Sequence, residues 1–217
     1  RLVNAIGNEA NDIWAYTFHS CCSRILRRFG EKIGYTNHFT IYDTDDSRRV
    51  MKQCQKQLGI EDKLINHKSI LAEISRAKDS LISPEEYKQT AQNDFRKSKI
   101  AECYELYQAQ LKKSDAMDFD DIIFNTVKLL EENEDVRNLY QTQFKYVMVD
   151  EYQDTNHAQY VLTSLLADKY KNICVVGDDD QSIYRFRGAT IENILSFENH
   201  YKGAKVIRLE ENYRSTQ

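Results

Sequence analysis

Two adjacent carboxylates, Asp150 and Glu151, directly follow a short apolar run from Tyr146 to Val149. A continuous apolar run that ends in polar residues is typical of a buried strand in a parallel sheet. Because ligands bind beyond the carboxyl ends of strands in open α/β sheets, we expect both acids at a reaction site. The alternative is that they are ordinary loop acids that cap the following helix.

Two later apolar runs also end in polar residues. Asn172 to Val176 leads into a polar segment that contains Gln181, and Lys205 to Leu209 leads into one that contains Arg214. Helical spacing of apolar residues between these runs completes the order strand, helix, strand, helix, strand, which predicts a parallel, doubly wound sheet. Asp150, Glu151, Gln181 and Arg214 should then lie near one another on one rim of the sheet.

Two acids, a glutamine and an arginine suit metal-assisted phosphoryl transfer. Carboxylates can hold Mg²⁺, which usually keeps several of its waters, and a second carboxylate can orient or deprotonate an attacking water. A glutamine can contact the terminal phosphate, and an arginine stabilises transition-state charge, an effect of roughly 10³–10⁵ in rate. The alternative enzyme class is a nuclease whose acids hold metals that cut DNA directly.

Beside this predicted rim, Tyr184 and Phe186 alternate with Arg185 and Arg187. Aromatic rings that stack on bases, next to cations that hold phosphates, are typical of single-stranded nucleic-acid binding. The alternative is that the two rings pack in the core.

Composition limits the class of protein. The 217 residues carry a net charge of −4, which argues against a globally basic nucleic-acid binder but allows a local basic groove. The five cysteines include no Cys-x-x-Cys pair, so we expect reduced, mostly buried thiols in a cytoplasmic protein. No apolar run approaches the roughly 18–20 residues that span a bilayer, and the first residues lack a signal-peptide layout.

The rest of the chain predicts one α/β core with an inserted helical lobe. The aromatic run Ile13 to Phe18 indicates a strand, with Ser20 as N-cap of a helix that carries three arginines, which either hold phosphates or form a solvated face. Residues 43–115 have helical spacing throughout, and Ser83-Pro84 begins one of these helices. Asp118, Asp120 and Asp121 open a helix whose apolar stripe starts at Phe119; the acids suit the helix dipole, with metal binding as the alternative.

Five segments together resemble successive motifs of the superfamily 1 DNA helicases of the UvrD/Rep/PcrA type. They cover essentially the whole chain in the family's order: Thr17 to Ser20, Asp118 to Asp121, Val149 to Asn156, Gly177 to Ala189 and Glu211 to Thr216. The resemblance implies a RecA-like (P-loop NTPase) parallel sheet, incomplete, over residues 1–42 and 116–217 as domain 1A. It also implies that residues 43–115 form the helical subdomain 1B.

The resemblance also implies a role for each site residue. Asp150 would serve Mg²⁺ and Glu151 the hydrolytic water, both as candidate metal ligands; Gln181 would contact the γ-phosphate of ATP, and Arg214 would be a second phosphate contact. Tyr184 and Phe186 would stack on DNA bases, and Thr17, His19 and Arg187 would lie along the DNA path. Implied partners are single-stranded DNA, the junction with duplex DNA, and repair or replication proteins.

Two departures from the family pattern matter. Phe186 stands where the family commonly has tryptophan, which gives a smaller stacking surface. No Gly-x-x-x-x-Gly-Lys-[Ser/Thr] phosphate loop occurs in the sequence. We therefore expect a fragment of a 3′→5′ helicase that neither hydrolyses ATP nor unwinds DNA alone; a non-catalytic module that binds DNA or a protein is the third alternative.

Overall fold

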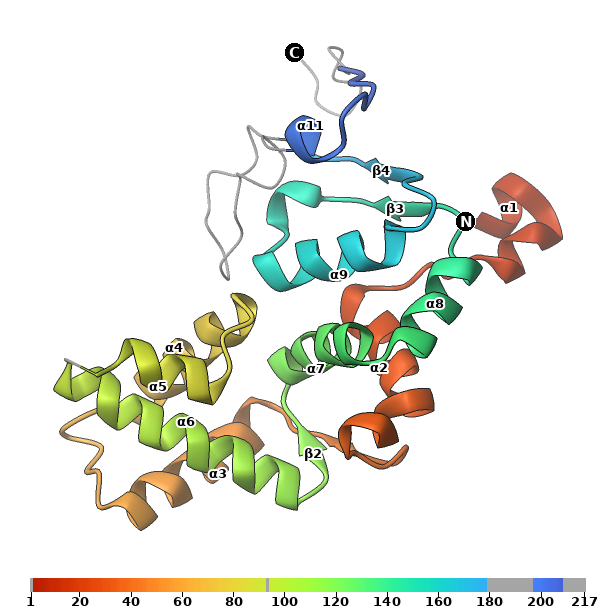
Figure 1. Ribbon diagram of the computed structural model, residues 1–217. Helices are drawn as coiled ribbons and strands as arrows, with labels where there is room; N and C mark the ends of the chain where they lie inside the picture. The colour runs from red at the N-terminus through yellow and green to blue at the C-terminus, as the bar shows by residue number, and fades with distance from the viewer. Residues whose placement is uncertain (1, 93, 179–196, 209–217) are drawn as a thin grey trace, which may run out of the picture.

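The computed structural model of the chain describes residues 2–92, 94–178 and 197–208 (Figure 1). This part of the protein is a mostly helical α/β structure with two small parallel sheets of two strands each. One sheet pairs β1 (Thr40–Ile41) with β2 (Ala116–Met117), and the other pairs β3 (Val147–Val149) with β4 (Ile173–Val175). Before β1 lie α1 (Leu2–Ile6), α2 (Phe18–Phe29) and two 3₁₀ turns, Gly7–Asp12 and Gly30–Ile33.

Four helices lie between β1 and β2 in the sequence, and we call residues 43–115 the helical lobe. The four helices of this lobe are α3 (Thr44–Leu58), α4 (His67–Asp79), α5 (Pro84–Thr90) and α6 (Phe95–Lys113). Asp43 and Ser83 each form a capping box with the third residue of the helix that they start, so local side-chain chemistry sets where α3 and α5 begin.

The chain after β2 carries the elements around the predicted site. These are α7 (Phe119–Glu132), α8 (Glu134–Gln143), β3, a 3₁₀ turn (Tyr152–Asp154), α9 (His157–Ala167), β4 and α11 (Phe197–His200). Asp118 caps α7 and Asn156 caps α9, each through a capping box.

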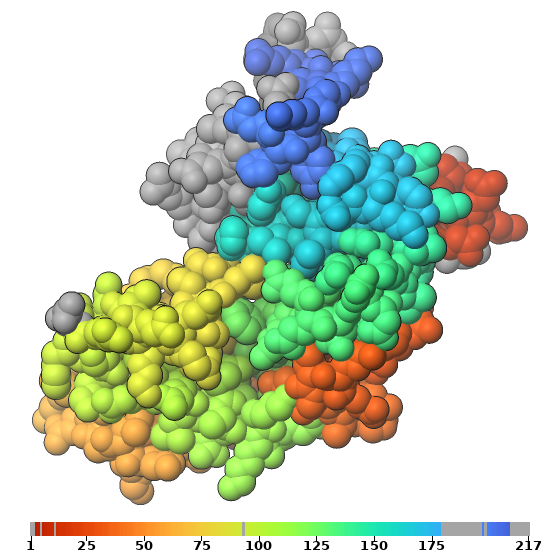
Figure 2. Space-filling view, viewed as in Figure 1, coloured from red at the N-terminus to blue at the C-terminus, as the bar shows by residue number. Residues whose placement is uncertain are grey.

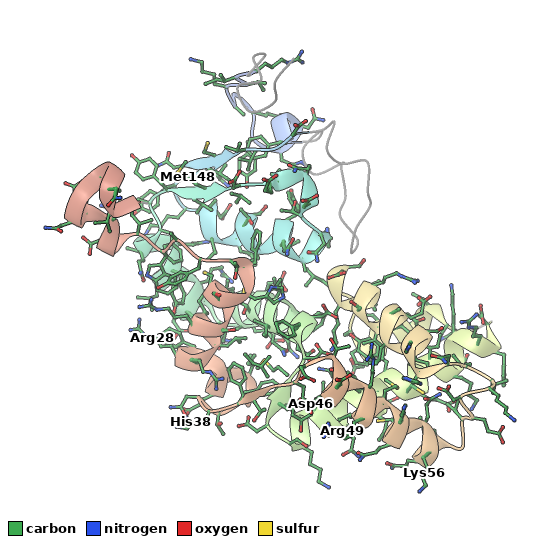
Figure 3. All side chains as sticks on the ribbon, turned by 180° about the vertical axis from the view of Figure 1, so that it is seen from behind. Arg28, His38, Asp46, Arg49, Lys56 and Met148 are labelled. Atoms are coloured by element: carbon green, nitrogen blue, oxygen red, sulfur yellow. The ribbon has the colours of Figure 1, made fainter. Side chains whose placement is uncertain are left out.

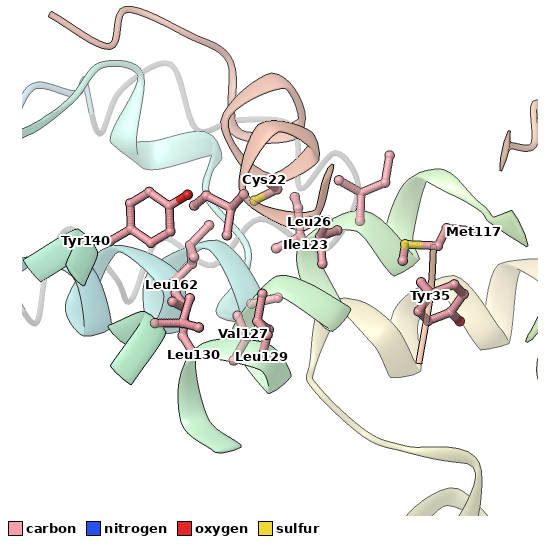
Figure 4. Close-up of a cluster of buried hydrophobic side chains, with 14 of the residues drawn as sticks. Cys22, Leu26, Tyr35, Met117, Ile123, Val127, Leu129, Leu130, Tyr140 and Leu162 are labelled. Carbon is pink, nitrogen blue, oxygen red and sulfur yellow. The ribbon is translucent and has the colours of Figure 1, made fainter. Parts of the chain in front are cut away.

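Buried apolar residues form two separate clusters. The first core joins α2, α7, α8 and α9 and contains Cys22, Leu26, Ile123, Tyr140 and Leu162 (Figure 4). The second core lies within the helical lobe and contains Met51, Ile74, Tyr104 and Tyr107. The helical lobe therefore has its own apolar interior. Its helix α4 also packs against α7 and α9, which lie outside the lobe.

The β3–β4 ladder has parallel register, with Val147 opposite Ile173 and Val149 opposite Val175. The predicted parallel pairing of these two strands is confirmed. Full burial is not: Met148 is 76% exposed and Cys174 is also exposed, because α9 covers only one face of the pair within the described residues (Figure 3).

Two predicted strands are wrong. Residues 13–17 form no strand, and α2 begins at Phe18 with Thr17 rather than Ser20 as N-cap. The aromatic residues before α2 pack differently: Trp14 makes edge-to-face contacts with Tyr140 and Phe144. Residues 205–208 are not a strand either, and Ile207 is 71% exposed; residue 209 lies outside the described part.

Within the described ranges, none of the helices is both long and apolar enough to cross a bilayer. The cysteines are free thiols, of which Cys22, Cys54 and Cys103 are buried, as expected for most of them. Burial raises the pKa of Cys21 to about 11 and that of Cys103 to about 12, so neither thiol is poised for reaction.

Candidate functional site

The two predicted catalytic acids lie in the loop at the carboxyl end of β3. Val176 N donates to Val149 O at 2.8 Å, and Tyr152 N donates to Val176 O at 2.9 Å, so the acid loop is held between two backbone bonds to the chain after β4. Asp150 and Glu151 are both exposed, and Asp150 Oδ1 accepts a hydrogen bond from Glu151 N at 3.0 Å. These acids therefore face solvent at the end of β3, beside the end of β4, and their role at a reaction site stays a prediction.

Gln153 connects the acid loop to the loop after β4. Its Nε2 donates to Glu151 Oε2 at 2.8 Å, and its Oε1 accepts from Asp178 N at 3.0 Å. The side chain is only 1% exposed, so both amide groups are used in a nearly dry position. No local pattern singles out Gln153, because the fold around the 3₁₀ turn determines its hydrogen-bond partners.

Glu151 has a left-handed backbone, with φ 51° and ψ 43°. For a residue with a Cβ this conformation costs about 1–2 kcal/mol, and such outliers concentrate at functional sites. The conformation turns the chain sharply after β3, and the 3₁₀ turn that contains Gln153 follows at once. The acid loop is thus held in an unfavourable backbone state by its surroundings.

Thr17 and His19, the described members of the predicted DNA path, lie at the start of α2. Thr17 Oγ1 accepts from Ser20 N at 3.3 Å and caps the helix. The His19 ring meets the Phe119 ring edge-to-face, with centroids 5.6 Å apart, so the N-terminal ends of α2 and α7 lie side by side. Exposed backbone N–H groups at helix N-termini are suited to phosphates.

Phe119 was predicted to belong to the apolar stripe of α7, and that prediction is wrong. Its side chain is 52% exposed, whereas Ile122, Ile123 and Val127 are buried as expected. An exposed ring beside His19 is available for stacking on a base. The only sequence signal was its position between acids at the start of a helix.

The acids at the start of α7 serve structure. Asp118 and Asp121 form a capping box and both bind Lys78, at 2.7 and 2.8 Å, so the ammonium group fills the place that a metal ion would need. Although burial opposes both charged forms, the neighbouring acids raise the pKa of Lys78 well above its usual value, and Lys78 lowers that of Asp118. Burial and the Asp118 charge raise the pKa of Asp121 to about 6.

The arginines of α2 form an exposed face on aromatic rings. The guanidinium carbon of Arg24 lies 4.4 Å from the Trp14 ring centroid, and that of Arg27 lies 3.9 Å from the Phe39 centroid. Arg27 also donates to Asn37 O at 3.0 Å. These contacts stabilise the local surface, and they favour the solvated-face alternative for this helix.

Five predicted site residues lie outside the described part of the chain: Gln181, Tyr184, Phe186, Arg187 and Arg214. The predicted meeting of Gln181 and Arg214 with the acids therefore stays a prediction.

The donor set of the acid loop fits Mg²⁺. This ion typically takes one or two protein carboxylates and completes its shell with waters and phosphate oxygens. The exposed pair Asp150 and Glu151 meets that requirement, and no larger cluster of metal-binding side chains lies among the described residues.

Comparison with known families identifies the class of protein. The family model described as UvrD/REP helicase N-terminal domain matches residues 1–202, and the chain belongs to this family. The predicted family resemblance is thereby confirmed.

Individual relatives add detail. The chain is 49% identical over all its 217 residues to the "ATP-dependent DNA helicase PcrA" of Staphylococcus epidermidis, of which it covers 30%. It is 48% identical to the protein of the same name from Bacillus subtilis strain 168, covering 29%, and 47% identical to that of Staphylococcus aureus, covering 30%. The chain thus spans less than a third of the length of these relatives.

Proposed function

We propose that this chain is part of an ATP-dependent DNA helicase that moves 3′→5′ on single-stranded DNA and unwinds duplex DNA. Support comes from the family match and from the PcrA relatives, which are named as ATP-dependent DNA helicases. In this proposal residues 1–42 and 116–217 belong to a RecA-like domain 1A, and residues 43–115 form subdomain 1B. The two apolar cores support this division, because the first is built from residues 22–39 and 117–166 and the second from residues 51–116.

The observation that carries the catalytic part of the proposal is the Gln153 bridge. It fixes the Glu151 carboxylate at the end of β3 and ties it to the loop after β4, where ligands bind in such sheets. A carboxylate fixed in this way can orient a water molecule and accept its proton.

Asp150 and Glu151 are the residues that would hold Mg²⁺ in this proposal. Held there, Mg²⁺ would supply positive charge that offsets the negative charge of the ATP phosphates. Asp150 supplies the carboxylate at the strand end, Glu151 accepts the proton of the attacking water, and Gln153 keeps Glu151 in place. Gln181 and Arg214 are proposed as contacts to the γ-phosphate.

DNA would bind across the adjoining starts of α2 and α7. Thr17 and the helix N-termini would contact phosphates, and His19 and Phe119 would contact bases; Phe119 adds to the residues predicted from sequence. Tyr184, Phe186 and Arg187 are proposed to continue this path. The helical lobe would face the duplex at the junction.

The test is Glu151→Gln in the whole protein that contains this chain. We expect single-stranded-DNA-stimulated ATP hydrolysis to fall by at least about 10³-fold, within the range for loss of a positioned group in phosphoryl transfer, while ATP still binds. Asp168→Asn, an exposed acid at the end of α9, is the matched control. DNA cleavage without nucleotide that disappears in Glu151→Gln would instead support the nuclease alternative.

The 217-residue chain alone is proposed to be inactive. Its sequence contains no phosphate loop to cradle the triphosphate, so we expect no ATP turnover with single-stranded DNA. Clear turnover by the purified chain would contradict this part of the proposal.

A further inference from the structure

The last two residues of α4 contact the N-terminal ends of two helices outside the helical lobe. Lys78 Nζ lies 2.7 Å from Asp118 Oδ2 and 2.8 Å from Asp121 Oδ1, at the start of α7. Asp79 Oδ1 accepts a hydrogen bond from Asn156 Nδ2 at 2.6 Å, at the start of α9. The C-terminal end of α4 therefore contacts the N-terminal ends of both α7 and α9.

Further contacts reinforce the same junction. Leu81, just after α4, has a left-handed backbone with φ 58° and packs against the first core. An apolar residue in this strained conformation indicates that the surrounding contacts hold the turn firmly. In the space-filling view the yellow surface of α4 adjoins the green and cyan surfaces of α7 and α9 (Figure 2).

The start of α7 belongs to the proposed DNA path, whereas the start of α9 lies next to the proposed catalytic acids without being one of them. The start of α7 carries Phe119, whose ring touches His19 on the proposed DNA path. The start of α9 is Asn156, which follows the turn that contains Gln153, the partner of Glu151. Only the segment from Tyr152 to Thr155 separates Glu151 from the residue that Asp79 holds, and Tyr152 and Thr155 are both buried.

We propose that Asp79 is a positioning residue that couples DNA binding at the start of α7 to ATP hydrolysis at Glu151. This inference rests on the proposed function. Lys78 fixes the end of α4 to the DNA side through a buried ion pair, and Asp79 transmits its position to the acid loop through Asn156. Coupling of this kind can be carried by a contiguous set of packed groups that both sites bias, and α4 provides such a set from within the lobe.

The Asp79–Asn156 contact can be broken without removing the N-cap of α9. Asn156 also caps α9, since its Oδ1 accepts from Gln159 N at 2.9 Å. Aspartate is as good an N-cap as asparagine, so Asn156→Asp keeps the cap. It removes the Nδ2 donor, however, and sets two carboxylates against each other.

The experiment measures ATP hydrolysis by the whole protein with and without single-stranded DNA. In Asn156→Asp we expect DNA stimulation to fall about tenfold, within the range of typical coupling effects, with DNA-free hydrolysis and the KM for ATP unchanged. The double variant Asn156→Asp with Asp79→Asn restores a donor opposite a carboxylate, and we expect it to recover the stimulation. Glu105→Gln, which breaks an exposed ion pair between α5 and α6 in the same lobe, is the control and should change nothing.

Several results would overturn the inference. Unchanged stimulation in Asn156→Asp would do so, as would a double variant that fails to recover. An equal loss of DNA-free and DNA-stimulated hydrolysis would show that Asp79 has a purely structural role. A loss of stimulation that weaker DNA affinity explains completely would also exclude coupling. A wild-type protein without ATP hydrolysis would overturn the proposed function itself, and this inference with it.

Discussion

Gln153 and Glu151 are joined by a hydrogen bond of 2.8 Å from the amide Nε2 to the carboxylate Oε2. The same amide accepts from Asp178 N at 3.0 Å, so one side chain spans the ends of β3 and β4. A buried amide with both groups used orients its partner closely, because any other rotamer would leave a polar group unsatisfied. The exposed catalytic candidate is thus held by a residue that is itself nearly inaccessible.

Replacing Gln153 with leucine should lower the catalytic rate without removing the acids. A hydrogen bond to a charged group contributes about 1.5–3 kcal/mol, so kcat in the whole protein should fall about 10- to 100-fold. Gln141→Leu is the matched control, since Gln141 is also a buried amide and donates to Leu165 O at 2.7 Å, away from the acid loop. If both variants lose activity equally, Gln153 has no special role in placing Glu151.

Phe119→Ala should weaken binding of single-stranded DNA. Stacking on one base contributes about 1–3 kcal/mol, so the Kd measured by fluorescence anisotropy should rise about 5- to 150-fold. Phe95 offers a closely matched control: it is 68% exposed, and like Phe119 it is the first helical residue after an aspartate N-cap, on α6 instead of α7. Equal weakening in Phe95→Ala would argue against a specific stacking site.

Local sequence signals predicted the parts of the fold that local chemistry decides. The helix starts at Ser83 and Asp118 were predicted correctly, because the capping box found at each joins residues only three positions apart. The apolar runs that became β3 and β4 were also found, and their register puts Asp150 and Glu151 beside the loop after β4. The chemistry proposed for these acids follows from their type and from their position at a strand end.

Features that depend on residues far away in the sequence were predicted wrongly or not at all. The aromatic run at 13–18 looks like a strand, but strand formation needs a neighbouring backbone, and Trp14 instead packs on Tyr140 and Phe144. Phe119 fits the helical period of a core residue, yet no apolar surface covers it within the described chain. The contacts of Lys78 with Asp118 and of Asp79 with Asn156 join residues 40 and 77 positions apart, which no local pattern encodes.

Lys78→Met should destabilise the chain strongly. Lys78 is 1% exposed, and its removal leaves the carboxylates of Asp118 and Asp121 buried without a counter-charge. Loss of one partner from a buried ion pair costs about 3–5 kcal/mol, which urea unfolding of the 217-residue chain would detect. Lys99→Met breaks a half-exposed pair with Glu102 and should cost at most about 1 kcal/mol. A similar small loss in both variants would show that the Lys78 cluster is neutral to stability.

Asp121→Asn should change the pH dependence of stability in one direction. Burial and the Asp118 charge raise the pKa of Asp121 from 3.8 to about 6 in the folded protein. Between these pH values the folded state binds more protons at this group than the unfolded state does. The contribution of Asp121 to the free energy of unfolding therefore falls as pH rises from about 4 to about 6.

The difference in unfolding free energy, wild type minus Asp121→Asn, should accordingly decrease across that interval and stay level above about pH 7. Urea unfolding at a series of pH values measures it. Asp118 acts in the opposite direction, because Lys78 overcomes the burial penalty and lowers its pKa. Its contribution is lost only as pH falls through the lower range, so the effects of the two acids can be separated.

Asp45→Asn, whose side chain is 77% exposed, is the control and should follow the wild-type profile. A difference that stays level or rises between pH 4 and pH 6 would contradict the raised pKa and show that Asp121 stays charged beside Lys78 over this range.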